Sequence, residues 1–159
     1  MVNEIIAAGY HRNHEVWTNP NKGVSSKDFV NFLNPHKGWS SGPTALWLAC
    51  LKGFKKIYIL GFDYQGLAGK FNNVYADTYN YKKSADSATF HGNWLNQTER
   101  VIKEYKTVSF KRIIEPGAFT PPQLESKNLS NLQHVYYEEF NRINQIDIYK
   151  EQIDQKTII

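Results

Sequence analysis

Residues 38–64 combine the signals of a helix start, a helix end and a short buried strand in close succession. Pro43 suits the first turn of a helix, because the amide nitrogen there has no partner within the helix in any case. Gly53 suits the left-handed end of that helix. The pattern predicts a helix from about Pro43 to Lys52, and its apolar composition on nearly every side predicts that it is buried.

A short apolar run follows this helix almost directly. Residues 57–60 read Ile-Tyr-Ile-Leu, a composition typical of a central strand in a parallel sheet. We expect Gly61 to permit the close approach of another backbone or of a ligand. Asp63 and Tyr64 then fall where open α/β sheets have their ligand crevice, beyond the carboxyl ends of the strands. The segment therefore favours the binding of a small anionic ligand.

The remaining apolar patterns predict further strands and helices. Strands are expected over residues 2–8, 15–18, 108–114 and 133–140. Helices are expected over residues 93–105, with an amphipathic pattern, and from a cap at Ser25 or Ser26 through Leu33. Because strands and helices alternate, we expect an α/β fold with a three-layer, Rossmann-like open sheet that is mostly parallel and carries helices on both faces.

The length of 159 residues is that of one domain. We assign residues 1–142 to a single α/β domain and residues 143–159 to a polar C-terminal tail. Residues 65–90 have no sustained period, and connections of this length in a compact domain are commonly lids or binding loops. The alternative is a disordered insertion.

Composition limits the functional classes further. The single cysteine, Cys50, lies in the apolar helix and is expected to be a core residue, not a nucleophile. No apolar run approaches the ~20 residues of a membrane span, and no secretory signal pattern is present, so we expect a soluble, cytoplasmic protein. His11 and His14 have no cysteine or carboxylate companions in a recognisable motif, so no metal is expected.

The start of the helix and the end of the strand are expected to meet at the carboxyl edge of the sheet. Ser40 or Ser41 can accept hydrogen bonds from first-turn amides, and the amides of Ser41 and Gly42 can bind an anion. Asp63 and Tyr64 would lie beside them. The alternatives are that Ser41 only caps its helix and that Asp63 only bonds a neighbouring turn.

His91 precedes the amphipathic helix and is the candidate general base, since histidine is the commonest base near neutral pH. The alternative is that it caps the helix. Together with the helix start and the strand end, it suits transfer or cleavage at a phosphate-bearing donor.

Residues 40–42, the helix after them and residues 53–64 resemble a stretch of the bacterial lipooligosaccharide sialyltransferases. There a Ser-Gly helix start is followed by a Gly-Tyr-Lys-Glu-Ile-Tyr-Leu-like strand and a Gly-x-Asp. The similarity covers residues 39 to about 113. A pterin pyrophosphokinase-like group shares this signature, so the resemblance marks a superfamily better than a substrate.

The resemblance implies roles for single residues. The Ser-Gly helix start would bind the cytidine nucleotide, and Tyr64 or Tyr75 would stabilise the departing phosphate. His91 would be the base toward the acceptor hydroxyl, and Asp63 would shape the pocket. Only 38 residues precede the match, and they lack the Gly-Asn-Gly-Pro-Ser-like turn that opens the family's nucleotide-binding half.

Two functions follow as expectations. The first is metal-independent transfer of a sugar from a nucleotide sugar, with no cofactor. The second is capture of a nucleotide or a nucleic acid without turnover, which the net charge of +4 and the 23 aromatic residues (ten Tyr, nine Phe and four Trp) also suit. A homodimer that covers an exposed strand edge is a third alternative.

Overall fold

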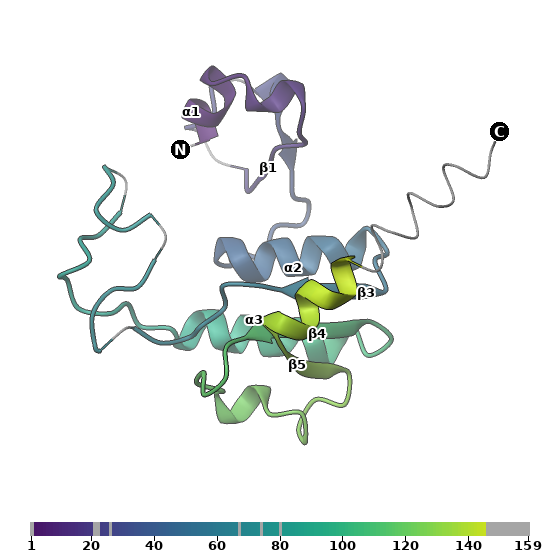
Figure 1. The fold of residues 1–159 in the computed structure, drawn as a ribbon. Coiled ribbons are helices and arrows are strands. Elements are labelled where there is room, and N and C mark those ends of the chain that lie inside the picture. The colour runs from purple at the N-terminus through teal and green to yellow at the C-terminus, as the bar shows by residue number, and fades with distance from the viewer. Residues whose placement is uncertain are drawn as a thin grey trace.

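The structure is a computed structural model, and it describes residues 2–20, 23–25, 27–66, 68–73, 75–79 and 81–145. Its main sheet contains three parallel strands in the order β3 (Lys56–Ile59), β4 (Ser109–Ile114) and β5 (Leu132–Tyr136) (Figure 1). The predicted α/β class with a parallel sheet is confirmed. The expected central strand is instead an edge strand of this sheet, and β4 is central.

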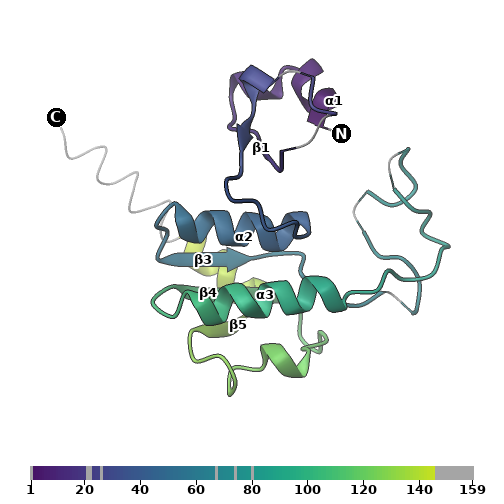
Figure 2. The same ribbon diagram turned by 180° about the vertical axis from the view of Figure 1, so that it is seen from behind.

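Helices cover both faces of the main sheet. Figure 2 shows α2 (Ser41–Leu51) and α3 (Gly92–Glu104) on the near side of the strands. A helix over residues 137–145 lies on the opposite side, where the ring of Phe140 contacts that of Tyr58 with centroids 5.1 Å apart. This gives the three layers that the sequence predicts.

The hydrophobic core lies between β4 and the two helices of one face. Phe110 is the largest of its fully buried side chains. The core also contains the buried residues Leu46, Trp47, Cys50, Ile59, Val101, Ile102, Val108, Leu124, Leu129 and Leu132. Cys50 is therefore a core residue, as predicted, and Gly53 has the left-handed φ of 86° expected after α2.

The helix α2 is less buried than its composition predicts. Leu46, Trp47 and Cys50 are buried, whereas Ala45 and Leu51 are exposed. One side of the helix therefore faces solvent, because the core packs against a single stripe of it. The expectation that this helix is buried on nearly every side is therefore wrong.

The first predicted strand is a helix. The short α1 (Val2–Ala7) occupies the segment, and Ile6 is its buried side chain. A run of only four apolar residues does not by itself distinguish helix from strand, and its two alanines favour the helix. A 3-10 turn, η1 (Tyr10–Arg12), follows it.

The predicted helix ending at Leu33 is also wrong. A 3-10 turn, η2 (Lys27–Phe29), leads into β2 (Asn31–Phe32), which is parallel to β1 (Trp17–Thr18). Residues 31–33 are extended because they pair with β1: the amide of Leu33 donates to the carbonyl of Thr18 at 3.1 Å. The strand expected over residues 15–18 is confirmed in part, and Ser26 lies outside the described residues.

The last predicted strand ends earlier than expected. After β5 the chain turns into the helix over residues 137–145, in which Glu138 and Glu139 occupy the first turn. Acidic side chains at this end of a helix are favoured by its dipole. The predicted tail is thus helical as far as residue 145, and its residues 146–159 lie outside the described part of the chain.

A long connection joins β3 to α3. In its described residues the structure contains no helix or strand, only an isolated antiparallel bridge between Lys70 and Ser87. Figure 1 shows it beside the sheet, at the ends of α2 and α3. A shorter connection after β4 contains the 3-10 turn η3 (Pro122–Leu124). No helix among the described residues is long and apolar enough to span a membrane.

Asn131 links the end of α3 to the start of β5. Its side-chain amide donates to the carbonyls of Ile102, Tyr105 and Val108 at 3.0, 3.1 and 3.2 Å. Asn131→Ala is expected to lower the free energy of unfolding by about 1–3 kcal/mol, because buried carbonyls would lose their donor. Urea denaturation measures this. The control is Asn128→Ala, whose exposed side chain makes one such bond; equal losses in both variants would contradict the prediction.

Candidate functional site

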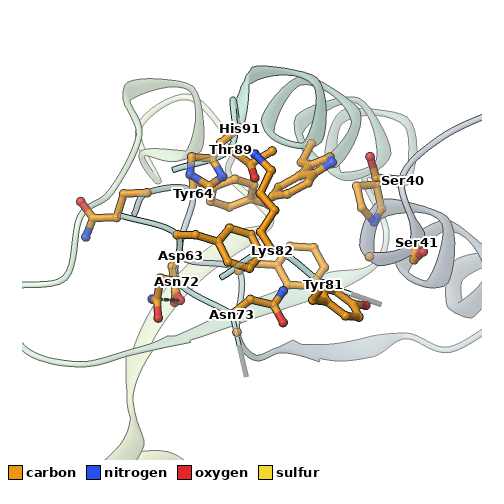
Figure 3. A pocket seen from close by; sticks show the side chains of 17 residues that line it. Ser40, Ser41, Asp63, Tyr64, Asn72, Asn73, Tyr81, Lys82, Thr89 and His91 are labelled. Atoms are coloured by element: carbon orange, nitrogen blue, oxygen red, sulfur yellow. Dashed lines mark hydrogen bonds between the residues drawn. The ribbon is translucent and has the colours of Figure 1, made fainter. Parts of the chain in front are cut away.

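A cavity of about 550 Å³ lies at the carboxyl end of β3, between the starts of α2 and α3 (Figure 3). Its volume is typical of small-molecule sites. The cavity is lined by Ser40, Ser41, Gly42, Pro43, Gly61, Phe62, Asp63, Tyr64, Gln65, Phe71, Asn72, Asn73, Tyr81, Lys82, Thr89, His91 and Trp94. It therefore combines aromatic walls with a small number of polar and charged groups.

The start of α2 forms one wall, but not through capping serines. Ser40 occupies the N-cap position without a side-chain capping bond, so the predicted cap is wrong; its own amide donates to Oε1 of Gln97 at 3.0 Å. The amides of Ser41 and Gly42 begin the helix, where amides have no partner within the helix. A Cβ on Gly42 would lie 2.8 Å from Cζ of Phe62, so the helix start fits closely against the strand end.

The end of β3 forms the facing wall. Gly61 has a φ of 72°, a conformation that favours glycine, and no other backbone among the described residues approaches the open space where its Cβ would be; the predicted approach of a ligand stays a prediction. Asp63 accepts a long hydrogen bond, 3.5 Å, from Nδ2 of Asn72. Figure 3 shows Asp63 and His91 on the side of the cavity opposite Ser40 and Ser41.

Tyr64 lines the cavity, and its hydroxyl forms a hydrogen bond within the protein. It is buried, and its hydroxyl donates to Oγ1 of Thr98 on α3 at 2.7 Å. Burial raises the pKa of Tyr64 to about 12, which keeps the hydroxyl neutral. Tyr64 therefore joins the end of β3 to α3, and the phosphate contact that the resemblance implies stays a prediction.

Tyr75, the second candidate for phosphate contact, is not among the residues that line the cavity. Its exposed ring packs on Tyr81, with centroids 5.3 Å apart, and Tyr81 does line the cavity. Lys82 follows and adds a positive charge. Neither residue was among the predicted site residues, although the tyrosine-rich run that ends at Tyr81 was a signal for them.

His91 stands at the N-cap position of α3 without capping the helix. Both of its ring nitrogens are buried and have no hydrogen-bond partner. Its ring meets Trp94 edge to face, with centroids 5.3 Å apart. Burial lowers the pKa of His91, and the Asp63 carboxylate partly opposes this. The imidazole is therefore neutral at pH 7 and has a free lone pair in the cavity wall.

Fold and site together define a small parallel α/β protein with an aromatic and polar pocket at the carboxyl edge of its sheet. The described residues contain no group of three or more His, Cys, Asp or Glu side chains that could hold a metal ion. Comparisons with known protein families, curated proteins and solved structures found no significant match.

Proposed function

We propose that the chain binds a nucleotide or a nucleotide sugar in this pocket and transfers the sugar without a metal. The observation that carries the proposal is that His91 lines the same cavity as the start of α2, and that its two ring nitrogens are unpartnered. Aromatic rings such as Phe71 and Tyr81 suit a base or a sugar face. Lys82 and the helix start suit a phosphate.

His91 would act on the acceptor hydroxyl. Its neutral imidazole takes the hydroxyl proton while the acceptor oxygen bonds to the anomeric carbon of the sugar. The bond from that carbon to the phosphate oxygen breaks, and its electron pair leaves with the nucleotide. The first amides of α2 and the Lys82 ammonium stabilise the charge that develops on the departing phosphate.

Capture without turnover is the second candidate. Two observations favour it: the Tyr64 hydroxyl donates its hydrogen bond to Thr98, and Tyr75 does not line the cavity. Neither tyrosine then assists the leaving group. A nucleic acid would fit this reading through exposed rings such as Tyr79 and Phe90.

The testing experiment is a thermal-shift screen of the full chain at two salt concentrations. The ligands are CMP, CDP, UDP, GDP, AMP, pterins, CMP-sialic acid and short oligonucleotides. A ligand that binds the folded state raises the melting temperature by mass action. A selective, salt-tolerant shift with a nucleotide or nucleotide sugar is expected. A shift with oligonucleotides alone that disappears at high salt would indicate nucleic-acid binding instead, and no shift would contradict both candidates.

The pH profile gives a further prediction. A base is active when deprotonated, and burial places the pKa of His91 below the ordinary 6.5. Activity is therefore expected to persist as the pH falls to 6.5 and to decline only at lower pH. Measurement of kcat/KM against pH checks this. Asp63→Asn should move the acidic limb to still lower pH, because it removes the charge that raises the pKa of His91. An acidic limb above pH 6.5 would contradict the assignment.

A further inference from the structure

Arg112 is a buried cation that the proposed mechanism does not use. It lies near the carboxyl end of β4 and is only 3% exposed. Its Nε donates to the carbonyl of Phe62 at 3.0 Å, and its Nη2 donates to the carbonyl of Phe119 at 3.1 Å. Its Nη1 is buried without a hydrogen-bond partner. Within the described part of the chain, no carboxylate forms an ion pair with it.

Arg112 lines a second, smaller cavity of about 90 Å³. Pockets that hold whole small molecules measure about 300–1,000 Å³, so this one has room for a single chemical group. The cavity is lined by Asp63, Gln65, Gly66, Asn72, Arg112, Ala118 and Phe119. Three of these residues, Asp63, Gln65 and Asn72, also line the larger cavity. The two cavities therefore share a wall.

The protein groups around the Arg112 guanidinium satisfy only some of its hydrogen-bond donors and do not neutralise its charge. The ring of Tyr64 lies 5.5 Å from its central carbon, a cation–π contact that offsets part of the cost of burial. Two carbonyls accept from it, but neither neutralises its charge. Burial lowers the pKa of Arg112 while the nearby Asp63 opposes this, and arginine remains charged in proteins. A buried charge ordinarily has a partner of opposite sign.

We propose that Arg112 binds one oxyanion group of the ligand, a phosphate or a carboxylate, in the smaller cavity while the rest of the ligand occupies the larger one. Nη1 and the second N–H of Nη2 are the available donors, and guanidinium groups pair with such oxyanions in this planar way. Asp63, on the shared wall, accepts a hydroxyl or amino donor from the same ligand. This inference rests on the proposed binding function and adds which group of the ligand is recognised.

The competing explanation is that Arg112 is purely structural and only donates hydrogen bonds to the carbonyls of Phe62 and Phe119. Ala118→Leu separates the two, because it fills the smaller cavity and leaves the guanidinium and both carbonyls in place. Arg112→Gln is the direct variant. Lys111→Met is the matched control: it removes a positive charge from the neighbouring position of β4, which lines neither cavity.

The experiment is calorimetric titration of the full chain with inorganic phosphate, pyrophosphate and acetate, together with a melting curve for every variant. At least one of these oxyanions is expected to bind the unchanged protein. The one that binds with the highest affinity shows whether the cavity prefers a phosphate or a carboxylate. Ala118→Leu and Arg112→Gln should each weaken it by about tenfold or more, as loss of a charged hydrogen bond implies. Lys111→Met should bind it normally.

Two outcomes would overturn the inference. One is that no oxyanion binds the unchanged protein, and the other is that Ala118→Leu keeps its melting temperature and binds as the unchanged protein does. If a nucleotide still binds in either case, the proposed function stands while the role of Arg112 fails. If oxyanions bind through Arg112 but no nucleotide binds, the role of Arg112 stands and the proposed function fails.

Discussion

His91→Ala is expected to reduce sugar transfer by about 10²- to 10⁴-fold, the usual contribution of a positioned general base. Nucleotide affinity should change little, because the proposed mechanism places His91 on the acceptor hydroxyl and not on the nucleotide. The measurements are kcat with the nucleotide sugar selected by the thermal-shift screen, and the Kd of that ligand by titration. Under this mechanism the loss falls on kcat and leaves Kd nearly unchanged.

His14→Ala is the matched control, since this histidine is exposed, stacks on Tyr10 and does not line the cavity. It should transfer the sugar at the normal rate. Full activity in His91→Ala would exclude His91 as the base. A large loss of affinity with an unchanged kcat would make it a binding residue instead.

Phe110→Ala is expected to lower the free energy of unfolding by about 3–5 kcal/mol, the range for removing a fully buried aromatic side chain. Phe110 is 0% exposed and lies in the central strand, where β3 and β5 flank it. The loss combines the transfer of apolar surface with the cavity left behind. Urea denaturation measures it, with the slope checked for two-state behaviour.

Phe54→Ala controls for the loss of a phenylalanine as such, because Phe54 is 57% exposed in the turn after α2. It should change the free energy of unfolding by less than about 0.5 kcal/mol. If the two variants lost equal stability, the core would not be centred on β4.

The central part of the fold could be predicted because its signals are local and mutually consistent. Residues 41–60 contain a helix start, a glycine stop and a continuous apolar run, and each agrees with the next. The amphipathic pattern before β4 is equally clear. Long periodic segments of this kind determine their own structure, and the parallel sheet follows from their alternation.

The structure of the N-terminal part could not be predicted, because contacts between residues far apart in the sequence determine it. Its strands β1 and β2 are two residues long, too short for any period to appear. The side chain of Asn3 donates to the carbonyl of Gly23 at 2.8 Å and accepts from the amide of Ser25 at 3.1 Å. Such bonds between distant residues override weak local preferences.

The residues of the candidate site could be predicted where they lie at the start of a helix or at the end of a strand. Ser40, Ser41, Gly42, Gly61, Asp63, Tyr64 and His91 all line the cavity. Tyr75 does not line it, and its predicted role stays a prediction; the path of a connection without regular structure cannot be read from its composition. Arg112 was not among the predicted site residues, because a charged side chain within a predicted strand does not by itself show that it is buried.

The close fit of Gly42 against Phe62 has a consequence for how this pocket can diversify. Any side chain at position 42 would have to displace the ring of Phe62, so the shape of this wall depends on where that ring lies. The lining residues Phe71, Asn72, Tyr81 and Lys82, which belong to the long connection, lie outside the core cluster. Under the proposed function, exchanges among these residues are expected to change which ligand binds, with little change in the stability of the fold.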